Sequence, residues 1–175
     1  MVFIIKEVYF TSIGYIIKYT NKFNIKGFDS MQVMTMASTR KVKKLAVRKY
    51  KALCYTYNEY VKIIDTTKEM LDKNLWIKGT AQTLPTCMEV LDELSKYALA
   101  VHLEIQQAYD ILKVELQAIE KMRKNGGIII NPVDYMRVVE MRELGIYLKE
   151  LSKETISILH ELTGMIDQIN EIEKN

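Results

Sequence analysis

Hydrophobic residues recur at alternating steps of four and three along most of the last third of the chain. This spacing keeps one narrow apolar edge of a helix facing the same way over about eight turns. A repeat of 3.5 residues, rather than 3.6, predicts left-handed supercoiling against another helix. This apolar edge comprises Leu144, Leu148, Leu151, Thr155, Ile158, Leu162, Met165, Ile169 and Ile172.

The same spacing occurs in two earlier segments, which provide long partners for this helix. The first set is Ala46, Tyr50, Leu53, Tyr57, Tyr60, Ile64, Thr67 and Leu71. The second set is interrupted once, at Glu115, and comprises Cys87, Leu91, Leu94, Ala98, Val101, Ile105, Ala108, Leu112, Ile119 and Met122.

Local signals place the helix ends at about 38–77, 86–124 and 132–173. Thr86 and Glu89 have the spacing of a capping box at the start of the second helix. Gly126 suits the stop after that helix, because glycine tolerates the left-handed conformation common there. Asn131 before Pro132 is typical of an N-cap followed by proline in the first turn.

The pattern therefore predicts an all-α protein, with residues 31–175 forming a single elongated three-helix bundle. Short connections favour antiparallel neighbours, and the heptad spacing favours coiled-coil-like packing. Residues 1–30 are expected to form an N-terminal arm, for which a helix and a β-hairpin are both compatible with the sequence. Charges at Lys6, Glu7 and Lys18 interrupt this arm too early for a membrane span, and we expect no signal peptide.

The middle of the second helix, residues 97–105, is apolar nearly all round. A helix with two neighbours would keep a polar face there, so either residues 1–30 or another subunit must cover it. Further apolar positions beside the third heptad set, including Val139, favour a subunit contact. The candidate interface residues are Leu99, Leu103, Ile146, Ile156, Leu159 and Ile166.

The start of the first helix is strongly basic, although the whole chain of 175 residues carries a net charge of only +3. In an up-down-up bundle this tract makes one end positive, while the opposite end is negative. Three interpretations remain open: a solvated surface, end-to-end self-assembly, or binding of nucleic acid or another polyanion. The candidate polyanion-binding residues are Arg40, Lys41, Lys43, Lys44, Arg48, Lys49 and Lys51.

Few residues suggest chemistry beyond binding. Of the tyrosines after the basic tract, only Tyr55 lies off the apolar edge, so it is the candidate for stacking on a base. His102 and His160 are the only histidines, and the chain has no Glu-x-x-His pair. Cys54 and Cys87 lack the CxxC spacing of zinc sites. We expect no metal, no cofactor and no small-molecule substrate.

Two functions follow from these observations. The first is a non-enzymatic structural or adaptor protein that self-assembles or docks a partner through apolar helix faces, for example within a virus particle or a bacterial complex. The alternative is a nucleic-acid-binding protein that uses the basic start of the first helix. Unpaired cysteines in a chain without a disulfide framework favour a reducing, cytoplasmic location.

Overall fold

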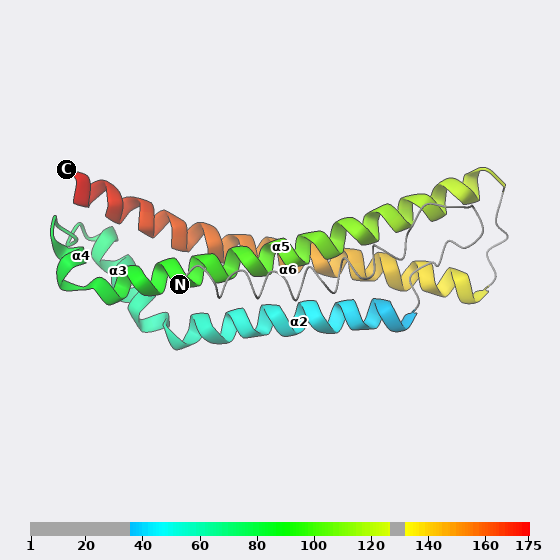
Figure 1. Cartoon of the computed structure of the whole chain (residues 1–175), viewed down its shortest axis with the longest axis horizontal. Coiled ribbons are helices and arrows are strands. Elements are labelled where there is room, and N and C mark those ends of the chain that lie inside the picture. Colours follow the sequence, from blue (N-terminus) through cyan, green and yellow to red (C-terminus); the bar gives the residue numbers. More distant parts are fainter. Residues whose placement is uncertain (1–35, 127–131) are drawn as a thin grey trace, which may run out of the picture. The chain divides into compact units, whose positions relative to one another are not determined.

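The computed structural model describes residues 36–126 and 132–175, and every regular element in those two ranges is a helix (Figure 1). This confirms the all-α prediction for the described part of the chain. The elements are α2 (Met36–Glu59), α3 (Val61–Asp72), α4 (Thr80–Thr83), α5 (Pro85–Lys124) and α6 (Pro132–Lys174).

The two longest helices, α5 and α6, pack against each other in antiparallel directions. Glu120 pairs with Arg142 near the end of α5, while His102 meets Ser152 further toward its start. The sequence numbers of the partners thus rise on one helix as they fall on the other. The heptad positions of α6 lie inside: all are buried except Ile158 and Ile172, which are half-buried.

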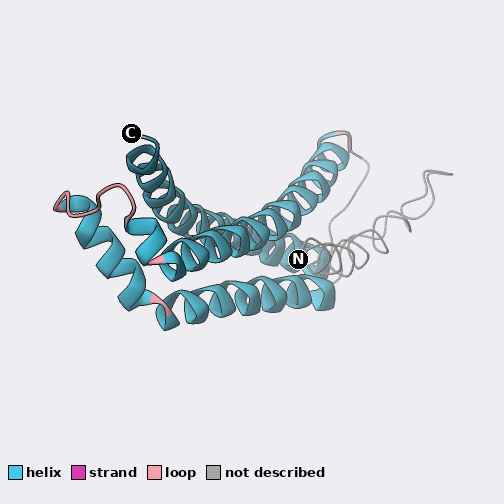
Figure 2. Ribbon diagram, turned by 60° about the vertical axis from the view of Figure 1, so that its left-hand side comes forward, coloured by secondary structure: helices cyan, strands magenta, loops and turns pink. Residues whose placement is uncertain are grey.

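Helices α2 and α3 pack on one side of this pair (Figure 2). Arg40 reaches Glu140 near the start of α6, and Tyr57 reaches Glu161 further along it, so α2 runs parallel to α6. Leu53 of α2 and Ile64 of α3 are fully buried in this contact. At the α3 end, the core gathers around Leu91 of α5.

The first predicted helix, 38–77, is not continuous. It breaks at Tyr60, whose backbone (φ −103°, ψ 7°) leaves the helical region and separates α2 from α3. The Tyr60 N–H bonds to the Tyr57 carbonyl at 3.1 Å, which is a tighter turn than an α-helix makes. The assignment of Tyr60 to the buried edge was therefore wrong, and its side chain is 38% exposed.

The same predicted helix also ends earlier than expected, at Asp72. Asn74 adopts a left-handed conformation (φ 53°), which closes the helix in the way glycine often does. The chain then turns so that Trp76, predicted at the helix end, is buried in the core at 3% exposure. The predicted loop after it contains the short helix α4.

A carboxylate near the C-terminus fixes this connection. Glu173 accepts hydrogen bonds from the Trp76 indole (3.2 Å) and from the backbone N–H groups of Gly79 (2.8 Å) and Ala81 (3.1 Å). Gly79 has φ 92°, a conformation that favours glycine. Three donors thus converge on one side chain of α6 and hold the turn against its last residues.

Three other helix ends carried a local sequence signal, and two of these agree with the sequence while one differs. α5 ends at Lys124, followed by Gly126 with φ 70°, and α6 begins at Pro132. The Thr86 capping box was wrong: α5 begins one residue earlier, at Pro85, and Leu84 in the N-cap position makes no side-chain capping bond. Proline in the first turn, rather than threonine, marks this start.

Two predictions fall outside the described residues, namely the arm at 1–30 and the Asn131 N-cap. In the described ranges, no helix combines the length and the apolar character that a membrane span requires.

Candidate functional site

The candidate interface residues of α5 and α6 lie mainly on the side of this pair away from α2. Contacts with α2 define the near side, where Glu104 bonds to Lys49 and Glu154 to Tyr50. His102 lies two residues before Glu104 on α5, and Ser152 lies two residues before Glu154 on α6. Each is therefore about 200° around its helix from that glutamate. Their mutual contact of 3.3 Å therefore lies on the opposite side of the α5–α6 pair.

Four aliphatic residues lie within about two helical turns of that contact, and a fifth, Ile166, lies further along α6, where it packs against the buried cluster at the α3 end. Leu99 and Leu103, three residues before and one after His102, are 42% and 37% exposed. The other three belong to α6 and are half-buried. We call the set Leu99, Leu103, Ile156, Leu159 and Ile166 the outer face.

The sixth candidate, Ile146, differs from these five in its exposure. It lies six residues before Ser152, about 120° around α6, and its side chain is 67% exposed. Its sequence position beside the heptad set did not distinguish a partly covered residue from one pointing to solvent.

The outer face has a polar centre that sequence reasoning treated only as an isolated histidine. The Ser152 hydroxyl lies 3.3 Å from His102 Nδ1 and 3.4 Å from Gln106 Oε1. These groups satisfy one another across the α5–α6 contact. Spacing on α5, with His102 and Gln106 four residues apart, was the available signal for a shared face.

The basic tract divides into two groups in the structure. Three of its cations face the other helices: Arg40 pairs with Glu140 at 3.4 Å, Lys49 with Glu104 at 3.3 Å, and Lys43 lies over the Tyr147 ring at 5.1 Å. The other four point outward and form no ion pair with a described carboxylate. These four are Lys41, Lys44, Arg48 and Lys51.

Tyr55 continues the outward-facing group and is 67% exposed. Its hydroxyl bonds to Glu59, and this bond raises the Tyr55 pKa above its ordinary value. The buried-edge tyrosines differ: Tyr50 is half-buried, and burial together with its bonds to Cys54 and Glu154 raises its pKa. The five residues Lys41, Lys44, Arg48, Lys51 and Tyr55 are the basic stripe.

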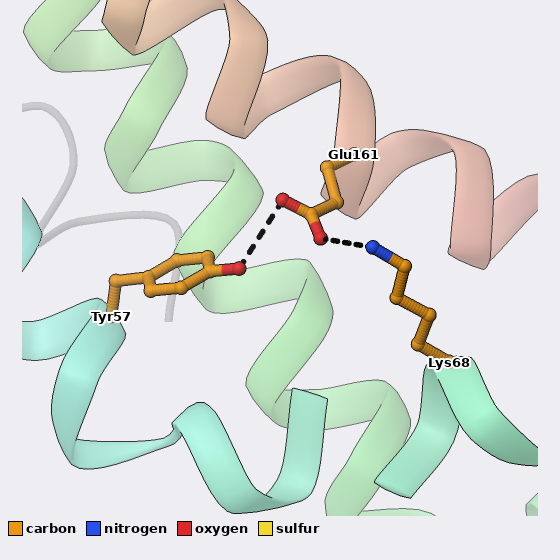
Figure 3. Close-up of polar contacts among 3 residues, drawn as sticks. All are labelled: Tyr57, Lys68 and Glu161. Carbon is orange, nitrogen blue, oxygen red and sulfur yellow. Dashed lines mark hydrogen bonds and ion pairs between the residues drawn. The ribbon is translucent and has the colours of Figure 1, made fainter. Parts of the chain in front are cut away.

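A third polar group joins α2, α3 and α6 (Figure 3). Glu161 accepts from the Tyr57 hydroxyl at 3.2 Å and pairs with Lys68 Nζ at 3.1 Å. Burial and the adjacent Glu161 charge raise the Tyr57 pKa to about 12. Sequence analysis missed Glu161, because its partners lie 104 and 93 residues away.

Beside this group is an open depression of about 220 Å³ between α3 and α6, lined in part by Lys68, Asp72 and His160. The Glu161 carboxylate at its edge is already engaged by Tyr57 and Lys68, so its charge stabilises the contact between the helices. Among the described residues, no three histidine, cysteine or acidic side chains gather in a way that could hold a metal.

Comparison of the chain with protein-family models, curated proteins and solved structures finds no match. The surfaces described above therefore carry the functional argument by themselves.

Proposed function

We propose that this protein is a non-enzymatic structural or adaptor protein that assembles with a second copy of itself through the outer face. The observation that carries the proposal is the line of five aliphatic side chains along one side of the α5–α6 pair. Helices α2 and α3 cover the other side of the pair, whereas the outer face presents apolar side chains of α5 and α6 to a partner. A helix pair with apolar positions on both sides is typical of a larger helical assembly.

The composition of the outer face suits such a contact. Leucine and isoleucine supply apolar area, and burying that area stabilises association by about 25 cal/mol per Å² before the costs of binding. The contact between His102 and Ser152 lies among these residues, and it pairs the Ser152 hydroxyl with His102 Nδ1. A paired polar group can enter an interface without a large desolvation cost.

We also propose that α2, α5 and α6 form a three-helix bundle with coiled-coil-like heptad packing. The burial of Leu144, Leu148 and Leu151 at steps of four and three supports this arrangement. A crystal structure tests it: we expect interdigitated side chains and a crossing angle near +20° between α5 and α6. A crossing angle near −50° would contradict the heptad register.

Light scattering at low and high salt tests the assembly. We expect an oligomer whose mass does not change with salt, because apolar contacts are not screened by ions. Replacing Ile156, Leu159 and Ile166 together with glutamine should release folded monomers. Ile77→Gln is the control, since this isoleucine is 67% exposed and lies in the connection after α3. A wild-type protein that is monomeric in both buffers would overturn the proposal.

A second candidate function, nucleic-acid binding, is supported by the basic stripe. Four outward-facing cations along one line of α2 are sufficient to contact several phosphates without sequence preference. This surface is separate from the outer face, so the two functions are compatible and can be tested independently.

A further inference from the structure

The basic stripe is a regular feature of α2. Its members stand at positions 41, 44, 48, 51 and 55, so the steps alternate between three and four. Residues at such steps are neighbours on one side of a helix, with Cβ atoms about 5–6 Å apart. All five side chains are exposed, which makes a continuous line of four cations ending in an aromatic ring.

The cations of the tract are sorted by their position around the helix. Those that pair with Glu104 and Glu140 attach α2 to α5 and α6. The cations of the stripe take no part in these contacts. Their charges remain available to a ligand, and binding there need not disrupt the attachment of the helix.

We infer that the basic stripe binds single-stranded nucleic acid, with phosphates on the four cations and a base stacked on Tyr55. This inference rests on the second candidate function and names its substrate class. The stripe is about 21 Å long, since 14 residues separate its ends and each adds ~1.5 Å. With phosphates about 3.4 Å apart along a stacked strand, it spans roughly six nucleotides.

Tyr55 is the reason for preferring a single strand to a duplex or an acidic protein. An unpaired base offers a face for stacking on an aromatic ring, whereas paired bases in a duplex have their faces covered. An acidic protein would use the cations and would gain little from an exposed ring.

Glu59 also marks the end of the stripe. Its carboxylate lies one turn beyond Tyr55 and repels phosphate, so the strand should leave the helix there. The expected footprint therefore runs from Lys41 to Tyr55 and does not continue onto α3.

Fluorescence anisotropy with a labelled 20-nucleotide oligodeoxythymidylate and the full chain tests the proposal. We expect the logarithm of the association constant to fall linearly with the logarithm of the salt concentration. The slope should be about −3, because each of the four phosphate contacts contributes about −0.7. The variant K41Q/K44Q/R48Q/K51Q should lose this binding. The control K62Q/K113Q/K149Q/K174Q changes net charge equally, at exposed lysines elsewhere, and should keep it.

Substitutions at Tyr55 separate stacking from charge. Tyr55→Ala should weaken oligodeoxythymidylate binding by about fivefold or more, whereas Tyr55→Phe, which keeps the ring, should bind nearly as well as the wild type. Circular dichroism of each variant should show unchanged helicity.

Two competitors complete the test, a DNA duplex of the same length and heparin, which has charge but no bases. Both should compete less well than unlabelled oligodeoxythymidylate. If they compete equally and Tyr55→Ala binds like the wild type, single-strand recognition is overturned while a general polyanion function survives. If no nucleic acid binds at low salt, both the inference and the second candidate function fail.

Discussion

The Trp76 indole donates a hydrogen bond to Glu173 Oε1 at 3.2 Å, across 97 positions of the sequence. The same carboxylate accepts the backbone N–H groups of Gly79 and Ala81. These bonds favour the charged form, and they lower the Glu173 pKa below its ordinary value of 4.5. One side chain of α6 thus connects the turn after α3 to the end of the chain.

This relationship predicts a pH-dependent contribution to stability. A lowered folded-state pKa means that the contribution is present above pH 4.5 and is lost as pH falls through the folded-state value. We expect Glu173→Gln to unfold at lower urea concentration than the wild type at pH 7. The difference should shrink as pH is lowered from 7 toward 3, because protonation of the wild-type carboxylate removes the charge that these bonds favour.

Glu171→Gln is the matched control, because this exposed glutamate lies two residues away on the same helix. It should unfold like the wild type at both pH values. Fluorescence of Trp76, the only tryptophan, reports the transition at the affected site. A pH-independent difference between Glu173→Gln and the wild type would contradict the role of the charge.

The Tyr57–Glu161 bond predicts that stability is lost as pH rises into the alkaline range, whereas the Glu173 contribution is lost as pH falls. The Tyr57 pKa is raised from 10.0 to about 12, so its contribution is present below pH 10 and is lost as pH rises through about 12. We expect the wild type to lose stability above pH 10 more steeply than Tyr57→Phe. Urea unfolding at pH 8 and pH 11 measures the two slopes.

A double-mutant cycle isolates the same bond at neutral pH. Combining Tyr57→Phe with Glu161→Gln should show a coupling of about 1 kcal/mol in the free energy of unfolding. Lys68→Gln should have a smaller effect, because its pair with Glu161 is more than half exposed on the lysine side. Additive effects of Tyr57→Phe and Glu161→Gln would exclude a favourable bond.

Some parts of the fold could be predicted from the sequence because the signals are local. Pro132 fixes the start of α6, since its ring presets the backbone angle of a first helical residue. Gly126 follows α5 in the left-handed conformation that its lack of a Cβ permits. The buried heptad positions follow from spacing alone.

Other parts depend on partners far away in the sequence. No proline or glycine near Tyr60 signals the break between α2 and α3. Tyr57 before the break and Lys68 after it both bond to Glu161 on α6, which is far away in the sequence. Likewise, the buried Trp76 bonds to Glu173, which lies 97 residues away in the sequence. Asn74 was a usable signal for the end of α3, because asparagine tolerates the left-handed conformation better than most residues.

The candidate surfaces show the same division. The sequence identified seven cations and Tyr55 as candidates without dividing them, and only the structure shows that Arg40, Lys43 and Lys49 engage other helices. For the outer face, the sequence identified the surplus apolar residues. It did not separate Ile146 from them, because that distinction depends on where α5 and α2 lie around α6.

Two glycines provide opposite predictions for helix stability. Gly164 lies within α6, and a Cβ added there meets no atom within 4 Å. Gly164→Ala should therefore stabilise the protein by about 0.5–1 kcal/mol, because alanine loses less backbone entropy than glycine in a helix. Gly126→Ala should destabilise it by about 1 kcal/mol, since φ is +70° there. Thermal unfolding of both variants measures the difference.

The last prediction separates the core of α6 from its outer face. Leu148 is fully buried, whereas Ile156 is half-buried on the side away from α2. Leu148→Ala should lower the free energy of unfolding by about 2–5 kcal/mol, because it leaves a cavity among packed neighbours. Ile156→Ala should cost less within one chain, because its side chain has fewer internal contacts to lose.

The two substitutions should have the opposite order in their effects on assembly, with Ile156→Ala weakening it more than Leu148→Ala. Ile156→Ala removes apolar area from the proposed contact between copies, so its oligomer should dissociate at higher protein concentration than that of the wild type. Leu148→Ala should keep the wild-type dissociation midpoint while it remains folded. Urea unfolding at fixed protein concentration and light scattering across a dilution series give the two rankings. If both substitutions changed stability and assembly in the same order, α6 would have no separate outer face.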